Sequence, residues 1–66
     1  MEVIVNGERR RVAEGATVLS LIDALSLPAA RVAVERNRAI VRKAEFGETV
    51  LAEGDRLEIV TFVGGG

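Results

Sequence analysis

The sequence contains no cysteine, histidine, tryptophan or tyrosine, and only one proline and two phenylalanines. Without cysteine the chain can form no disulfide and supply no thiolate nucleophile. Without histidine it lacks the most common general base and a frequent metal ligand. Its carboxylates show no EF-hand spacing and no other ligand cluster, so we expect no metal site.

Other absences concern partners. A net charge of −1 gives no electrostatic attraction to nucleic acid, and two phenylalanines offer little for base stacking. No apolar run approaches the length of a membrane span. Met1-Glu2 opens no basic region followed by an apolar stretch, the pattern of a secretory signal. We therefore expect no nucleic-acid partner, no membrane partner and a cytoplasmic location.

What is present indicates one folded domain. The hydrophobic fraction of 48% is typical of a globular chain, and 66 residues allow a single domain. We assign residues 1–63 to that domain and residues 64–66 to a C-terminal tail.

The first twelve residues predict a hairpin. Residues 1–5 alternate in side-chain character, which is typical of a strand. Asn6-Gly7 is the strongest short signal for a tight hairpin turn, and residues 8–12 follow as the return strand.

One helix is predicted from Thr17 to Ser26. Thr17 is suited to cap its first turn, whereas Ser20 is not the Glu of a full capping box. Pro28 disfavours helical backbone just before it and ends the element. The spacing of one buried helix face is shown by Val18, Leu21, Ile22 and Leu25.

Short strands are predicted after the helix, with a turn at Gly54-Asp55 before the last one. They cover residues 31–35, 38–41, 49–51 and 57–63, with a helical turn at 44–47. Hairpin, helix and then strands predict an α+β domain, a mixed sheet packed on one main helix.

The sequence ends on Gly64-Gly65-Gly66 directly after the last predicted strand. Three glycines add nothing to a core and lose much entropy when ordered, so we expect a flexible tail. Such a tail can carry its α-carboxylate into a narrow channel as a future acyl donor. The alternative is an ordinary frayed terminus.

In their order, these features resemble the ubiquitin-like β-grasp sulfur carriers, and most closely the ThiS-type carriers of thiamine biosynthesis. Residues 40–46 resemble that family's segment of an Ile-Val pair, a basic residue and an aromatic. Residues 54–59 resemble its Gly-Asp-x-aliphatic-Glu-aliphatic run, and Gly65-Gly66 its terminal diglycine. The resemblance extends over the whole chain.

The resemblance implies a carrier and not an enzyme, with no cofactor of its own. An adenylating (E1-like) activating enzyme would use ATP to adenylate the carboxylate of Gly66. Sulfur from a persulfide on a donor protein would displace AMP and leave a thiocarboxylate, which thiazole synthase would consume. Gly64 and Gly65 would thread the partner's active site.

Other readings share the same tail chemistry. They are the small subunit of molybdopterin synthase, a sulfur carrier for tRNA thiolation, and a ubiquitin-like modifier attached to lysines. The short chain favours the thiamine branch over the molybdopterin one. A β-grasp interaction module with an inert tail is a further alternative.

A partner-binding patch is predicted on the outer face of the sheet. If the alternate residues of the first and last strands face the helix, Ile4, Val60 and Phe62 face away from it. First and last strands are neighbours in a β-grasp sheet, so these three residues are expected to form one exposed apolar surface. The alternative is that Phe62 folds over the sheet edge. The run Arg9-Arg10-Arg11 is interpreted as a solvated strand face.

Overall fold

The computed structural model describes residues 1–62. The predictions for the remaining residues, a flexible tail at Gly64, Gly65 and Gly66 and a domain boundary after residue 63, lie outside the described part.

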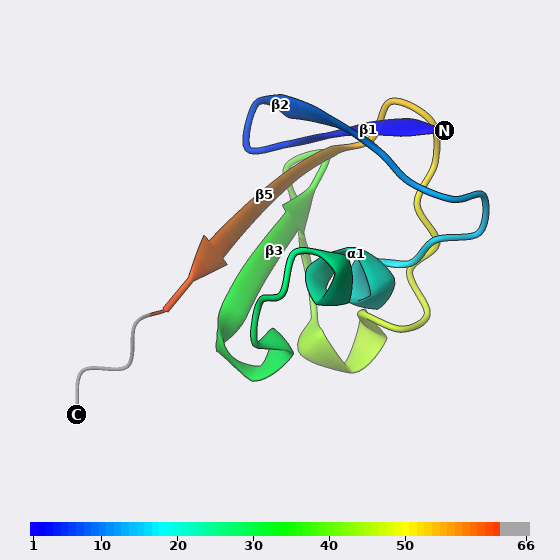
Figure 1. The fold of residues 1–66 in the computed structure, drawn as a ribbon. Helices are drawn as coiled ribbons and strands as arrows, with labels where there is room; N and C mark the ends of the chain where they lie inside the picture. Colours follow the sequence, from blue (N-terminus) through cyan, green and yellow to red (C-terminus); the bar gives the residue numbers. More distant parts are fainter. Residues whose placement is uncertain (63–66) are drawn as a thin grey trace.

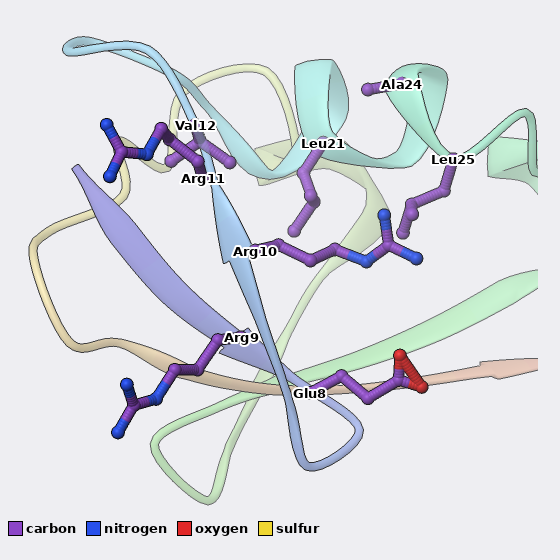
Figure 2. Close-up of a pocket in the computed structure, with 8 residues that line it drawn as sticks. All are labelled: Glu8, Arg9, Arg10, Arg11, Val12, Leu21, Ala24 and Leu25. Atoms are coloured by element: carbon purple, nitrogen blue, oxygen red, sulfur yellow. The ribbon is translucent and has the colours of Figure 1, made fainter.

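The chain begins with the predicted hairpin, formed by β1 (Glu2–Val5) and β2 (Glu8–Arg11) (Figure 1). Asn6 and Gly7 have φ of 49° and 83°, so both central residues are left-handed as a type I′ turn requires. Figure 2 shows Arg9 and Arg11 projecting from one side of β2 and Arg10 from the other, the side of the helix.

Helix α1 (Val18–Ala24) is capped at Thr17, as predicted. The expectation that Ser20 leaves the capping box incomplete is wrong. The Thr17 amide donates to Ser20 Oγ over 2.8 Å, and the Ser20 amide donates to Thr17 Oγ1 over 3.1 Å. The serine hydroxyl is short, but it also donates to the carbonyl of Thr17, which holds it within reach of the capping amide.

The helix ends one turn before Pro28, because the backbone reverses at Ser26 with φ of 59°. The Ser26 amide donates to the carbonyl of Asp23, and the Leu27 amide donates to that of Ile22. This pair of bonds is a Schellman motif, and it satisfies carbonyls that the helix leaves free.

The second half of the chain is made of short elements. They are η1 (Ala29–Arg31), β3 (Val32–Arg36), β4 (Ala39–Val41), η2 (Lys43–Glu45) and β5 (Arg56–Thr61). The predicted helical turn and the predicted strands are found with small shifts at their ends. The exception is residues 49–51, where the structure has a single bridge between Val50 and Thr17 instead of a strand.

The strands form one mixed sheet in the order β2-β1-β5-β3-β4. The neighbours β1 and β5 are parallel, and the other neighbouring strands are antiparallel. Helix α1 covers one face of this sheet (Figure 1). The predicted α+β architecture, with a mixed sheet on one helix as in the β-grasp, is confirmed.

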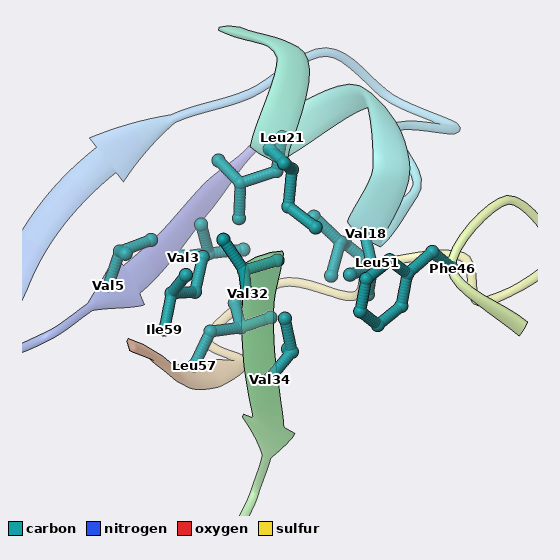
Figure 3. Close-up of a cluster of buried hydrophobic side chains, with 11 residues drawn as sticks. Val3, Val5, Val18, Leu21, Val32, Val34, Phe46, Leu51, Leu57 and Ile59 are labelled. Carbon is teal, nitrogen blue, oxygen red and sulfur yellow. The ribbon is translucent and has the colours of Figure 1, made fainter. Parts of the chain in front are cut away.

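The core lies between α1 and the covered face of the sheet (Figure 3). Leu21 is 3% exposed and Ile22 is fully buried, as the helical spacing predicts, while Leu25 is only half-buried at the rim. The buried hydrophobic residues are Val3, Val5, Val18, Leu21, Ile22, Val32, Val34, Phe46, Leu51, Leu57 and Ile59.

Candidate functional site

The candidate site is the outer face of β5 near its C-terminal end, where the chain leads into residues 63–66. Strand β5 is the middle strand of the sheet, between β1 and β3. Pairing on the β3 side continues past the end of β5, because the Phe62 amide donates to the carbonyl of Arg31 over 2.7 Å. The backbone is therefore held by hydrogen bonds as far as Phe62, the last described residue.

Val60 and Phe62 lie on the uncovered side of the sheet, as predicted. Their neighbours Leu57 and Ile59 are buried against the helix, whereas 56% of Val60 and 57% of Phe62 is exposed. The alternative in which Phe62 folds over the edge into a minor cluster does not fit this exposure. Two large apolar side chains thus face outward on the final strand.

Ile4 lies apart from these two residues, so the expected single surface of three is not formed. The register of the parallel pair sets Ile4 beside Arg56, four residues before Val60. At the rise of a strand this separation is about 13 Å. The apolar residue that does lie beside Val60 is Ala33 of β3. We call Ala33, Val60 and Phe62 the outer apolar patch.

Acidic and basic side chains border the outer apolar patch. Glu58 stands directly opposite Glu35 across the β3–β5 pair, and both residues are exposed. With Asn37, Arg38 and Arg56 they line an open cavity of about 400 Å³. Like charges directly opposite each other repel, but the two arginines of the lining balance the two glutamates, so the cavity has no excess charge of either sign.

The start of β5 is fixed by a buried carboxylate, Asp55, which is 6% exposed. Its Oδ2 accepts hydrogen bonds from Arg36 Nε and from the Ala52 amide, both at 2.8 Å. Its Oδ1 accepts one from Asn37 Nδ2 at 3.0 Å. These contacts join the loop before β5 to the end of β3.

The electrostatics of Asp55 follow from the same contacts. Burial alone raises the pKa of its carboxyl group, but the hydrogen bonds from Ala52, Asn37 and Arg36 and the charge of Arg36 lower it by more. The pKa of Asp55 is therefore below its usual value, and the group is ionised at neutral pH. Sequence reasoning assigned Gly54-Asp55 to a turn and to a run that resembles the family's, and it missed this network.

Asn6 is a second residue whose role exceeds its sequence signal. Its backbone amide donates to the carbonyl of Leu57 over 2.9 Å. Its side chain then acts like another strand residue: the Ile59 amide donates to Asn6 Oδ1 over 2.8 Å, and Asn6 Nδ2 donates to the carbonyl of Ile59 over 3.1 Å. The turn residue thereby extends the β1–β5 ladder toward the outer apolar patch.

Within residues 1–62, no three acidic, histidine or cysteine side chains gather closely enough to hold a metal ion. The same part of the chain contains no helix that is both long enough and apolar enough to cross a membrane.

Comparison with known proteins decides the family. The model of the ThiS family matches residues 3–66. The chain belongs to the ThiS family. A crystal structure of the thiamine biosynthesis protein ThiS from Geobacter metallireducens superposes on this chain with a TM-score of 0.83 and 36% sequence identity. The superposition covers the whole of both chains.

Relatives of known sequence agree with this family. The sulfur carrier protein ThiS of Bacillus subtilis is 42% identical over 50 residues, which is 76% of each chain. The thiazole synthase of Paramagnetospirillum magneticum is 42% identical over the whole of this chain. That match spans only about a fifth of the longer protein. The resemblance to ThiS-type carriers is thus confirmed.

Proposed function

We propose that this chain is a sulfur carrier of thiamine biosynthesis, and that the carboxylate of Gly66 carries the sulfur. The observation that supports this most is the ThiS family match, which runs through residues 3–66 and so includes all three final glycines. The names of its relatives favour thiamine over molybdopterin or tRNA thiolation as the destination of the sulfur.

The proposed chemistry begins with a poor electrophile. A carboxylate keeps its negative oxygen, so the activating enzyme first transfers AMP from ATP to it and releases pyrophosphate. A persulfide sulfur of the donor protein then attacks the carbonyl carbon, and AMP leaves. A thiol breaks the S–S bond of the resulting acyl disulfide, which leaves a thiocarboxylate on Gly66.

The chain contributes reach and presentation to this chemistry. With no cysteine and no histidine it has neither a thiol nor an imidazole to offer, so the partner proteins provide them. Fully extended, residues 63–66 span about 13 Å. A terminus on that length, with Gly64 and Gly65 threading the channel, enters an active site while the folded body stays outside.

Thiazole synthase is the proposed acceptor. The thiazole synthases of Paramagnetospirillum magneticum and Magnetococcus marinus are single chains in which about a fifth of the length matches this protein. A carrier-like segment within the same polypeptide supports a direct meeting of carrier and synthase in the present case.

The outer apolar patch is the proposed docking surface for the activating enzyme, with Ile4 further along the same face. Phe62 is the expected anchor, because aromatic residues dominate interface hot spots. Phe62→Asp should weaken binding to the activating enzyme by at least about tenfold. Ile40→Asp, on the exposed edge strand β4, is a matched control that should leave this affinity unchanged. Wild-type affinity in Phe62→Asp would remove this residue from the interface.

The test of the sulfur chemistry is intact-mass analysis. Incubation with the activating enzyme, ATP and a persulfide donor should replace one oxygen by sulfur in the C-terminal peptide. A chain of the same length with a carboxamide at Gly66 should stay unchanged, since it has no carboxylate to adenylate. Thiolation of the blocked chain, or none in the free one, would contradict the proposal.

A deletion tests reach separately. Because residues 64–66 are identical, removing Gly66 leaves a chain that still ends in two glycines and is one residue shorter. We expect this chain to lose activity, because misplacement of about 1 Å costs around a hundredfold in rate. If the shorter chain is thiolated as fast as the intact one, the length of the tail has no such role.

A further inference from the structure

Strand β2 is one edge of the sheet. Only β1 pairs with it among residues 1–62, and its four residues, Glu8–Arg11, are all exposed. An edge strand presents unpaired amide and carbonyl groups that another strand can use. Three of its four side chains are arginines, a feature that the proposed sulfur chemistry does not use.

The register identifies the free backbone groups. Met1 and Val12 exchange two hydrogen bonds, of 2.9 Å and 2.8 Å, so they are a hydrogen-bonded pair. Such pairs recur every second residue in an antiparallel ladder, which makes Arg10 part of the next one. Arg9 and Arg11 therefore direct their amides and carbonyls away from β1.

A groove runs beside this edge on the helix side. Its first part is an open cavity of about 450 Å³ between β2 and α1, where Leu21, Ala24 and Leu25 form the apolar wall and Glu8 lines the strand side at one end. Figure 2 shows Arg10 lying across it from the strand side. An adjoining cavity of about 290 Å³ has a largely apolar lining that includes Val12 and Leu21.

We propose that the edge of β2 binds an extended segment of a partner protein in which acidic and apolar residues alternate. Partner residues opposite Arg9 and Arg11 would share the outer face with the two guanidinium groups, which favours carboxylates there. Partner residues opposite Arg10 and Val12 would face the groove, which favours apolar side chains.

Charge selects this occupant over a second copy of the chain. Pairing β2 with another β2 would bring arginines against arginines, and like charges across strands are destabilising. An acidic segment reverses the sign of the same interaction. Strand β1 separates this edge from β5, so binding here leaves the outer apolar patch free. The proposal is thus independent of the proposed sulfur transfer.

The test uses a blocked peptide of three Glu-Val repeats, titrated into the ¹⁵N-labelled 66-residue chain. Amide shifts should change in β2 and α1. Hydrogen exchange should slow at Arg9 and Arg11 more than at Arg10, whose amide already bonds to β1. A Lys-Val repeat and a block peptide of three Glu followed by three Val are the controls, and both should bind at least about tenfold more weakly.

A charge swap makes the test specific. The double variant Arg9→Glu, Arg11→Glu changes only exposed side chains; because Arg11 stands opposite Glu2 in β1, it should lose some stability but keep the fold. Its affinity for the Glu-Val peptide should fall by about tenfold or more, and its affinity for the Lys-Val peptide should rise.

Several results would overturn the proposal. One is the absence of shifts at millimolar peptide, and another is equal binding of the block peptide, which would indicate charge attraction without strand pairing. Protection along β5 in place of β2 would place the peptide elsewhere. Tighter binding of a single-stranded oligothymidylate to the same amides would assign the edge to nucleic acid.

Discussion

Replacing Asp55 by Asn tests what holds the start of β5 in place. The substitution keeps the shape of the side chain and removes its charge. In the structure all three groups that point at the Asp55 carboxylate are donors, namely Arg36 Nε, Asn37 Nδ2 and the Ala52 amide. Whichever way an asparagine amide turns, its NH₂ group faces at least one of these donors.

The magnitude follows from those contacts. A hydrogen bond to a charged group is worth about 1.5–3 kcal/mol, and a buried donor left unpaired costs about 1–3 kcal/mol. The Arg36 side chain is 32% exposed, so water recovers part of its loss. We expect Asp55→Asn to lower the free energy of unfolding by about 2–3 kcal/mol at pH 7, a large share for a small domain.

The effect should depend on pH with a definite sign. Because the folded-state pKa of Asp55 is lowered, its contribution is present above the unfolded value of about 3.9. It is lost as pH falls through the folded pKa, where the carboxyl group becomes protonated in both states. The difference in stability between the two proteins should therefore shrink in acid.

Urea unfolding at pH 7 and at pH 2.5, followed by circular dichroism, measures this difference. Glu53→Gln is the matched control: it removes a carboxylate from the same loop, but an exposed one that accepts only the Glu2 amide. It should change stability by less than about 0.5 kcal/mol. An equal loss for Asp55→Asn at both pH values would show that its charge is not the cause.

Two further substitutions test the helix face and the second hairpin by the same unfolding assay. Leu21→Ala should cost about 2–5 kcal/mol, because Leu21 is 3% exposed, and an unchanged midpoint would place the helix face elsewhere. Arg38→Gly should stabilise the protein by about 0.5–1 kcal/mol, because Arg38 has φ of 72° in the turn between β3 and β4. Gly7→Ala, at φ of 83° in the other hairpin, is the control and should destabilise the protein. If Arg38→Gly also destabilises it, the arginine side chain has a stabilising role that outweighs the backbone strain.

The fold was predictable wherever its signals are local. Asn6-Gly7 specifies its turn through the backbone angles of two adjacent residues. The apolar spacing of α1 places Leu21 and Ile22 in the core because the helical period fixes which residues share a face. Ser20 was misjudged because the short-range geometry of its hydroxyl, and not its residue type, decides whether it caps.

The candidate site was only half predictable for a related reason. Alternation along a strand fixes which face a residue occupies, and it correctly places Val60 and Phe62 outside. It does not fix how far two distant strands are shifted along each other. The parallel register of β1 and β5 sets Ile4 beside Arg56 and not beside Val60. No local sequence pattern specifies this register.

The same register explains how the domain presents its last strand. Backbone pairing of β1 with β5 ends near Leu57, and the Asn6 side chain carries it one step further, to Ile59. Beyond that step β5 continues with a partner strand only on the β3 side, through the bond from Phe62 to Arg31. One firmly paired edge keeps the strand in line, while its other edge and its outer face stay open to a partner. The proposed activating enzyme can thus contact β5 as far as Phe62 without displacing any strand of the sheet.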